Sequence, residues 1–235
     1  MFESLINKFQ LRLKDRTSAG NLLAGSLKDF MKKERLTDDD DIVILGIPRG
    51  GVITADVIAQ KLNAAAKFDI VIPRKLAAPH NQELAIGAIV EDGTTYLNEN
   101  LIKMLEIQSD YLEKVKKEQI DEIRRRTAVY RQPGLGYNIC AGSIVILADD
   151  GAATGATLIA AARWIRKNYG PKKLIIALPV APKDTVSLLK KEADHVEVIT
   201  SPFTSNFRSV GQYYRDFNPV TDEQVIGIMK DRNLL

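Results

Sequence analysis

Short apolar runs alternate with amphipathic stretches along most of the chain. Apolar residues at helical spacing predict a first helix over 16–33, and similar patterns predict helices over 52–62 and 158–167. Apolar runs rich in β-branched residues predict strands over 41–47, 68–72, 143–148, 174–180 and 196–200. Strands that alternate with helices of this length favour a parallel sheet joined by right-handed crossovers. We therefore expect an α/β fold in which helices flank one parallel sheet.

Two segments depart from this alternation. Ile86–Val90 and Thr94–Leu97 flank Glu91-Asp92-Gly93, a sequence typical of a hairpin turn. Asn98–Tyr130 then carries apolar residues at helical spacing and predicts a long helix. Arg124–Arg126, near the end of this helix, could clamp a phosphate, face solvent or contact another subunit, and the sequence leaves these interpretations open.

The composition is that of an ordinary globular protein. Of the 235 residues, 45% are hydrophobic and 27% are charged, and the net charge of +3 is too weak to indicate nucleic-acid binding. Cys140 is the only cysteine, which excludes a disulfide within the chain and a cysteine-built metal site. No apolar run approaches the ~20 residues of a membrane span, and Met1–Arg16 lacks the apolar core of a signal peptide. We expect a cytoplasmic protein that binds neither membranes nor nucleic acid.

The strand over 143–148 is followed by the most informative residues of the chain. Asp149 and Asp150 end the apolar run, and the small residues of Gly151–Thr157 lead into the next helix. Glycines and threonines before a helix suit a phosphate, because backbone N–H groups and hydroxyls can surround it. Two carboxylates can in turn hold adjacent hydroxyls or a cation. An ordinary strand–turn–helix crossing does not require both acids and threonines, so the pattern indicates a 5-phosphoribosyl ligand.

A second glycine-containing loop, Pro48-Arg49-Gly50-Gly51, follows the first predicted strand. Considered alone, it could be an ordinary turn that opens a helix. Because ligands of parallel sheets bind beyond the carboxyl ends of the strands, we expect both loops at one edge and in one site. The acidic run Asp38–Asp41 precedes its strand and lies at the opposite edge, so we interpret it as a solvated loop.

Val145–Thr157 resembles the phosphoribosyl pyrophosphate (PRPP) signature of type I phosphoribosyltransferases. Asp15-Arg16-x-x-Ala19-Gly20, Glu83–Ala88 and Val210-Gly211-x-Tyr213-Tyr214 extend the resemblance to a subgroup with PRGG and DDGxATGxT loops. The resemblance implies a Rossmann-like core over 1–200 with a helical insertion at 98–131, then a C-terminal hood and last helix over 201–235. It also implies a pentosyltransferase of nucleotide metabolism and salvage, which moves the phosphoribosyl group from PRPP to a nucleobase and releases pyrophosphate.

The same resemblance assigns roles to the two loops. Asp149 and Asp150 would be catalytic residues that engage the ribose hydroxyls directly or through Mg²⁺, which diphosphate, ribose and water oxygens would mostly hold. Arg49, Gly50 and Gly51 would bind pyrophosphate, in a loop that often has an unusual peptide geometry in this family. The 5′-phosphate would be held by the following loop: Gly151, Ala152, Ala153, Thr154, Gly155, Ala156 and Thr157.

The resemblance further implies a mobile loop within 74–83. Closure would exclude water and bring Arg74 or Lys75 against the departing pyrophosphate, with Lys75 as a catalytic residue. Ala153 stands where 6-oxopurine enzymes place an acid near the base, so another group must handle protons, and Glu83 is the candidate. We interpret His80 as an ordinary loop residue, because no partner for it is evident.

The C-terminal segment is rich in aromatic residues. Tyr213 and Tyr214 are candidates for stacking on a base, although packing on the core explains such residues equally well. Arg215 inherits a pyrophosphate contact from the similar ending of some purine enzymes. Ser209 replaces the acid that precedes this ending, so the hood favours a purine acceptor without establishing it. Thr221 and Gln224 predict a capping box for the last helix.

One alternative function accompanies the enzyme hypothesis. A PRPP- or nucleotide-sensing regulator, binding RNA through 124–131, would keep the pocket without turnover. Lys75 in the expected mobile loop favours the enzyme. The resemblance also implies a homodimer, although no residue of the chain establishes it.

Overall fold

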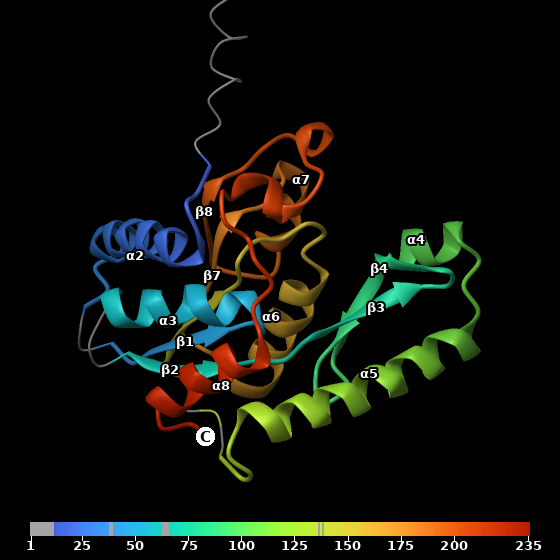
Figure 1. Ribbon diagram of the computed structural model, residues 1–235, viewed down its shortest axis with the longest axis horizontal. Helices are drawn as coiled ribbons and strands as arrows, with labels where there is room; N and C mark the ends of the chain where they lie inside the picture. The colour runs from blue at the N-terminus through green and yellow to red at the C-terminus, as the bar shows by residue number, and fades with distance from the viewer. Residues whose placement is uncertain (1–11, 38–39, 63–65, 136, 138) are drawn as a thin grey trace, which may run out of the picture.

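The centre of the protein is a parallel β-sheet. The computed structural model describes residues 12–37, 40–62, 66–135, 137 and 139–235, so Asp38 and Asp39 of the acidic run lie outside them (Figure 1). The sheet has five strands in the order β2-β1-β6-β7-β8, all parallel. These strands are β1 (Ile42–Gly46), β2 (Lys67–Ile70), β6 (Ile144–Ala148), β7 (Lys173–Val180) and β8 (His195–Thr200). The α/β fold expected from the sequence is confirmed.

Helices cover both faces of this sheet. α2 (Arg16–Lys33) and α3 (Gly50–Leu62) pack on one face, while α6 (Ala156–Tyr169) packs on the other. Along β1, Ile42 and Ile44 join the core on the α2–α3 side, and Val43 and Leu45 join the core on the α6 side. Because both faces are buried, the strands are continuous apolar runs rather than alternating ones.

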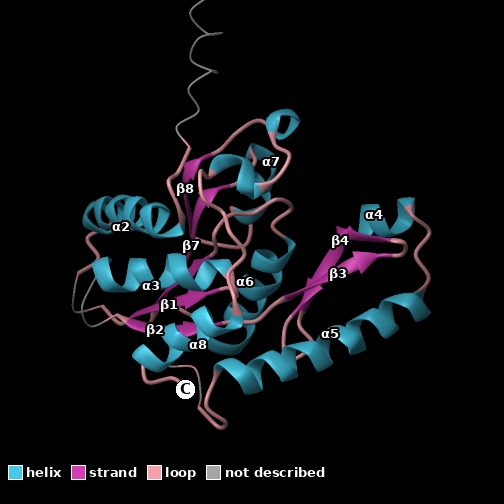
Figure 2. Ribbon diagram, viewed as in Figure 1, coloured by secondary structure: helices cyan, strands magenta, loops and turns pink. Residues whose placement is uncertain are grey.

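Residues 74–130 form a separate layer, which we call the hairpin arm. It contains a three-stranded antiparallel sheet of β3 (Arg74–Ala78), β4 (Asn81–Ile89) and β5 (Thr95–Leu97), followed by α4 (Glu99–Met104) and α5 (Ser109–Tyr130). β3, β4 and α5 extend to one side of the parallel sheet (Figure 2). Ala85 and Ala88 of β4 share a buried core with α6, so the arm is attached through that helix.

The arm differs from the sequence expectation in two places. The segment expected to be a mobile loop is a β-hairpin, in which β3 pairs with β4 and His80 takes a positive φ of 61° at the tip. The single long helix expected over 98–130 is two helices, because the chain turns between them and Glu106 has a positive φ of 50°. The β4–β5 hairpin turn at Glu91–Gly93 is confirmed.

A buried ion pair fixes the far end of α5 to the parallel sheet. Arg131, directly after α5, donates from Nη2 to Asp69 Oδ2 of β2 at 2.7 Å, and the two side chains are only 6% and 4% exposed. The Arg131 guanidinium also lies 4.0 Å from the ring centre of Tyr137. Burial raises the pKa of Asp69 even though Arg131 opposes the shift. Such a pair requires both partners, since either one alone would be an uncompensated buried charge.

The start of the described chain pairs with the C-terminal segment near Tyr214. Leu13 bridges to Tyr214 in parallel, with Leu13 N–H donating to Tyr213 O at 2.9 Å and Arg215 N–H donating to Leu13 O at 2.8 Å. α7 (Lys183–Leu189) and α8 (Asp222–Asp231) complete the C-terminal part. The capping box predicted for α8 is present, with Thr221 as the N-cap.

Candidate functional site

The two acids and the small-residue loop lie between β6 and α6. Asp150 N–H donates to Asp149 Oδ1 at 2.8 Å, so the first carboxylate is fixed by the backbone of the second acid. Gly151 has φ of 147°, and a Cβ there would lie 2.5 Å from Val210. Gly155 has φ of 74° immediately before the helix. Both positions therefore require glycine, which brings the loop to the N-terminus of α6 as a phosphate site demands.

Neighbouring elements hold the loop in place. Ala152 N–H donates to Val180 O at 2.9 Å, and the Thr185 hydroxyl on α7 donates to Ala153 O at 2.6 Å. Ala153 and Thr154 are exposed, whereas Ala152 is buried. The tip of the loop is consequently open to solvent while its base is anchored.

The Pro48–Gly51 loop lies directly against these acids. β1 ends at Gly46, the Pro48–Arg49 peptide bond is cis, and α3 begins at Gly50. The unusual peptide geometry expected for this loop is therefore present. A Cβ on Gly50 would overlap Asp150 Oδ2, and a Cβ on Gly51 would lie 2.8 Å from Asp149 Oδ1. The structure thus brings the two loops together at one sheet edge, and only glycines permit this approach.

A third charged residue, Arg16, belongs to the same cluster. Its Nε donates to Asp150 Oδ2 at 2.7 Å, its Nη1 donates to Asn218 O at 2.8 Å, and its guanidinium lies 4.0 Å from the Phe217 ring centre. Sequence reasoning did not assign Arg16 to the site. A signal was present, since Asp15 and Ser18 form a capping box that fixes the start of α2 at Arg16.

Burial and mutual repulsion set the electrostatics of the acid pair. Burial, together with the charge of Asp150, raises the pKa of Asp149 well above its ordinary value. The Tyr214 hydroxyl donates to the backbone oxygen of Asp150 at 2.7 Å, and burial with the same charge raises the pKa of Tyr214. Hydrogen bonds from hydroxyl groups, or a bound cation, would reduce the repulsion between the two carboxylates. The acid pair is therefore suited to either kind of ligand.

The donor set fits a magnesium ion that the ligand itself mostly coordinates. Within the described parts of the chain, no three His, Cys, Asp or Glu side chains gather closely enough to hold a metal ion. Asp149 and Asp150 supply two neighbouring carboxylates at this edge. Mg²⁺ commonly binds through one or two carboxylates and completes its shell with phosphate and water oxygens.

Arg49 points toward the C-terminal helix rather than toward the acids. Its Nη1 donates to Asp222 Oδ1 at 3.3 Å, with both side chains more than one-third exposed. The Tyr130 hydroxyl donates to the same carboxylate oxygen at 2.5 Å. The backbone of the Pro48–Gly51 loop therefore faces the acids while its cation contacts Asp222.

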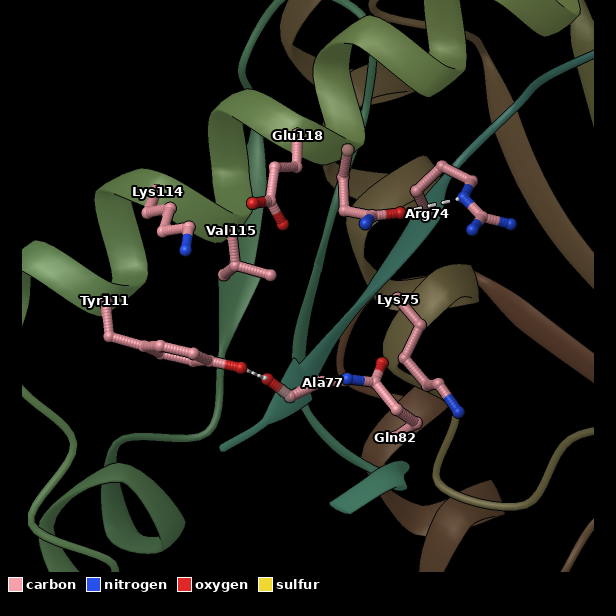
Figure 3. Close-up of a pocket in the computed structure, with 9 residues that line it drawn as sticks. Arg74, Lys75, Ala77, Gln82, Tyr111, Lys114, Val115 and Glu118 are labelled. Carbon is pink, nitrogen blue, oxygen red and sulfur yellow. Dashed lines mark hydrogen bonds between the residues drawn. The ribbon is translucent and has the colours of Figure 1, made fainter. Parts of the chain in front are cut away.

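Arg74 and Lys75 line a pocket of about 440 Å³ between the hairpin and α5 (Figure 3). Lys75 Nζ contacts Glu83 through its backbone oxygen at 3.4 Å and its carboxylate at 3.7 Å, and the Glu83 side chain is 97% exposed. Arg74 Nε donates to Gln119 Oε1 at 3.0 Å. Among the described residues, no hydrogen bond or ion pair joins Arg74, Lys75 or Glu83 to the acid pair.

The hood tyrosines are packed inward. Tyr213 and Tyr214 are each 3% exposed, and Tyr213 stacks on Phe207 with ring centres 5.7 Å apart. Their faces are covered in this conformation, so base stacking by these rings would require the hood to open. Arg215 is exposed, and its backbone N–H donates to Leu13 O.

A helix suited to crossing a membrane does not occur among the described residues. The arrangement at the sheet edge is that of a small-molecule site. Two glycine loops meet a carboxylate pair at the carboxyl ends of β1 and β6, which is where parallel sheets bind their ligands.

Comparison with known proteins agrees with this geometry. The family described as "Phosphoribosyl transferase domain" matches residues 18–218. A protein of Mycobacterium tuberculosis strain H37Rv, provisionally named a phosphoribosyl transferase, is 35% identical over 215 residues, which are 92% of this chain and 46% of that protein. The chain therefore spans about half the length of this curated relative.

Solved structures extend the comparison. The protein TT1426 from Thermus thermophilus superposes with a TM-score of 0.73 and 36% identity, covering 94% of this chain and 99% of that one. A purine phosphoribosyltransferase from Pyrococcus horikoshii has a TM-score of 0.43 and 14% identity, covering 79% of this chain and 85% of that one. The second similarity is too distant to bear on the acceptor of this chain.

Proposed function

Because the chain belongs to the phosphoribosyl transferase domain family, we propose that it transfers the 5-phosphoribosyl group from PRPP to a nitrogenous base. The observation that carries this proposal is the contact of Gly50 and Gly51 with Asp150 and Asp149. One loop suits a 5′-phosphate and the other a diphosphate, and the acids between them suit the ribose hydroxyls. PRPP carries these three groups in this order.

Each part of the site would contribute to one step. The C–O bond between the anomeric carbon and pyrophosphate breaks, a C–N bond to the base forms, and the proton of the base nitrogen leaves. Asp149 and Asp150 would hold the ribose hydroxyls and stabilise positive charge at the anomeric carbon. Mg²⁺, bound by these acids directly or through water, would neutralise charge on the diphosphate. Gly151–Thr157 would hold the 5′-phosphate at the start of α6.

The hairpin would act after the ligand binds. Lys75 and Arg74 would turn toward the departing pyrophosphate, and Glu83 would handle the proton of the base, if the hairpin moves toward the acids. The Lys75–Glu83 ion pair is long, at 3.7 Å, and the Glu83 side chain is almost fully exposed. Breaking this pair would therefore cost little, which supports such a movement.

A purine acceptor remains a proposal from the hood resemblance. Measurement of PRPP-dependent pyrophosphate release with purines, orotate, uracil and nicotinate would identify the acceptor. Release with one of these bases is expected. PRPP binding without release for any base would instead support a PRPP-sensing regulator.

The RNA-binding form of that regulator has little support from the arm. Arg124 pairs with Asp121 at 3.2 Å, and Arg125 and Arg126 each pair with Glu122 at 2.7 Å. These arginines are therefore partly neutralised by acids of their own helix. A homodimer and a cytoplasmic location also remain predictions, and sedimentation of the purified chain tests the first.

Asp150→Asn is the direct test of the acid pair. The substitution should reduce transferase activity at least about 100-fold and weaken PRPP binding, because it removes one charge from the ribose and metal position. Asp121→Asn on the exposed face of α5 is the matched control and should leave both unchanged. Wild-type PRPP affinity and turnover in Asp150→Asn would contradict the assignment.

A further inference from the structure

Arg16 is held at the acid pair by the N-terminal segment. Leu13 pairs with the hood at Tyr214, and Asp15 caps α2 by accepting the Ser18 N–H at 2.7 Å. Arg16 is the first residue of that helix, so its side chain leaves the chain at a fixed point. Two separate backbone constraints, one on each side of Arg16, thus determine where its guanidinium lies.

The guanidinium lies in a layered and largely buried position. Phe217 covers one side of it at 4.0 Å, Asn218 O accepts from Nη1, and Asp150 accepts from Nε. The Arg16 and Asp150 side chains are 11% and 16% exposed. A planar, always charged group that stacks on an aromatic ring suits this position better than a lysine would.

Arg16 also lies against the loop proposed for pyrophosphate. A Cβ on Gly50 would be 2.8 Å from Arg16 Nε, so the guanidinium lies directly beside Gly50, where the diphosphate would bind. Arg49, the cation that the sequence assigned to this role, contacts Asp222 instead. Among the described residues, Arg16 is the cation that forms an ion pair with the acids.

We propose that Arg16 is a diphosphate-binding residue of this site and also positions Asp150. In the free protein its charge allows Asp149 and Asp150 to stay close together. When PRPP binds, the guanidinium donates to the diphosphate beside Gly50, and Asp150 becomes available to the ribose hydroxyls or to magnesium. An arginine can serve both because its five N–H donors form a planar fork that matches phosphate oxygens. This role rests on the proposed function.

Binding measurements separate this role from a purely structural one. Calorimetry would compare inorganic pyrophosphate with ribose 5-phosphate, which lacks the diphosphate, for the wild type and for Arg16→Gln. Loss of hydrogen bonds to a charged group should weaken pyrophosphate binding about 10- to 100-fold and ribose 5-phosphate binding less than about 3-fold. Arg16→Lys should lose nearly as much, because an ammonium cannot form the fork.

Two further variants complete the experiment. Arg232→Gln removes a partly buried arginine that pairs with Asp56 of α3 at 2.7 Å, and it should change neither affinity. Phe217→Leu keeps the guanidinium but removes its stacking partner, and it should weaken pyrophosphate binding about 3-fold. This variant also serves if Arg16→Gln fails to fold.

The outcomes distinguish the two proposals. Equal losses for pyrophosphate and ribose 5-phosphate, or no loss for either, would overturn the role of Arg16. A selective loss of pyrophosphate binding in a protein that releases no pyrophosphate with any base would keep Arg16 as a diphosphate ligand while the transferase proposal fails. A wild type that binds neither PRPP nor pyrophosphate would overturn both.

Discussion

The Arg16–Asp150 pair at the loop edge of the parallel sheet is held more firmly than the Lys75–Glu83 pair on the hairpin arm. At the edge, Arg16 and Asp150 are mostly buried and pressed against the backbone of Gly50. On the arm, Glu83 is almost fully exposed and lies 3.7 Å from Lys75. Solvent screens exposed pairs, so they contribute little to stability and cost little to rearrange. The contrast indicates that the loop edge is arranged before the ligand binds, whereas charged side chains of the arm can exchange partners.

The ion pair at the joint between the two regions is buried, and the pair at the loop edge is mostly buried as well. Arg131 and Asp69 are buried at the end of α5, where the arm returns to β2. If the hairpin moves toward the acids, this pair keeps the base of α5 in place. Movement is therefore expected at the exposed tip of the hairpin, around Asn81–Glu83, rather than in the buried part of β4 or in the whole arm.

Breaking the joint should have the largest effect. Arg131→Met leaves the Asp69 carboxylate buried without its partner, which should lower the free energy of unfolding by about 3–5 kcal/mol. Urea denaturation measures this loss. Arg124→Met, at an arm pair whose side chains are 74% and 62% exposed, should cost less than about 1 kcal/mol. Equal losses for the two variants would remove the distinction between joint and arm.

Crowding the edge should have the next largest effect. Gly50→Ala places a methyl group onto Asp150 and beside Arg16, so these side chains must move. A loss of at least about 100-fold in kcat/KM, equivalent to about 2.7 kcal/mol, is expected with little change in the folded structure. Gly25→Ala is the control, since a Cβ there meets nothing within 4 Å and the position is helical. That variant should be fully active and slightly more stable.

Neutralising an arm charge should have the smallest effect. Hydrogen bonds from Arg125 and Arg126 lower the pKa of Glu122 to about 2, compared with an ordinary value of 4.5. Because the pKa of Glu122 is lower in the folded state, its carboxylate stabilises the protein at pH values above the unfolded-state pKa. This contribution is lost as the pH falls from there toward 2. Glu122→Gln should therefore be less stable by under about 1 kcal/mol at neutral pH.

The pH dependence checks that cause. The stability difference between wild type and Glu122→Gln, measured in urea, should shrink as the pH falls below about 4.5, and also in about 1 M salt. A difference that is the same at every pH would mean that Glu122 acts through packing rather than charge.

The sequence predicted the edge well because its information is local. Asp149, Asp150 and the following glycines and threonines are consecutive, and so are Pro48–Gly51. Apolar runs place each group at the end of a strand, and the rule for parallel sheets then brings the two groups together. The same argument placed the acidic run before β1 away from the site.

The arm was predicted less accurately for an equally physical reason. A few residues such as Glu106 decide where one helix ends and the next begins, and hydrophobic periodicity cannot locate such a break. One long helix was therefore expected where two occur. The 74–83 segment was expected to be a mobile loop because the family resemblance implies one there. Pairing with the buried end of β4 makes it a strand, and that pairing is a tertiary interaction.

Local sequence patterns were enough to predict the α/β fold, the five strands of the parallel sheet and the two loops that point to a phosphoribosyl ligand. The cation that pairs with the acids, in contrast, depends on long-range packing. Arg16 and Asp150 are 134 residues apart, and Arg49 contacts a carboxylate 173 residues away. Local patterns specify strands, turns and caps, but the partner of a charged side chain depends on how distant segments pack, which no short-range spacing encodes.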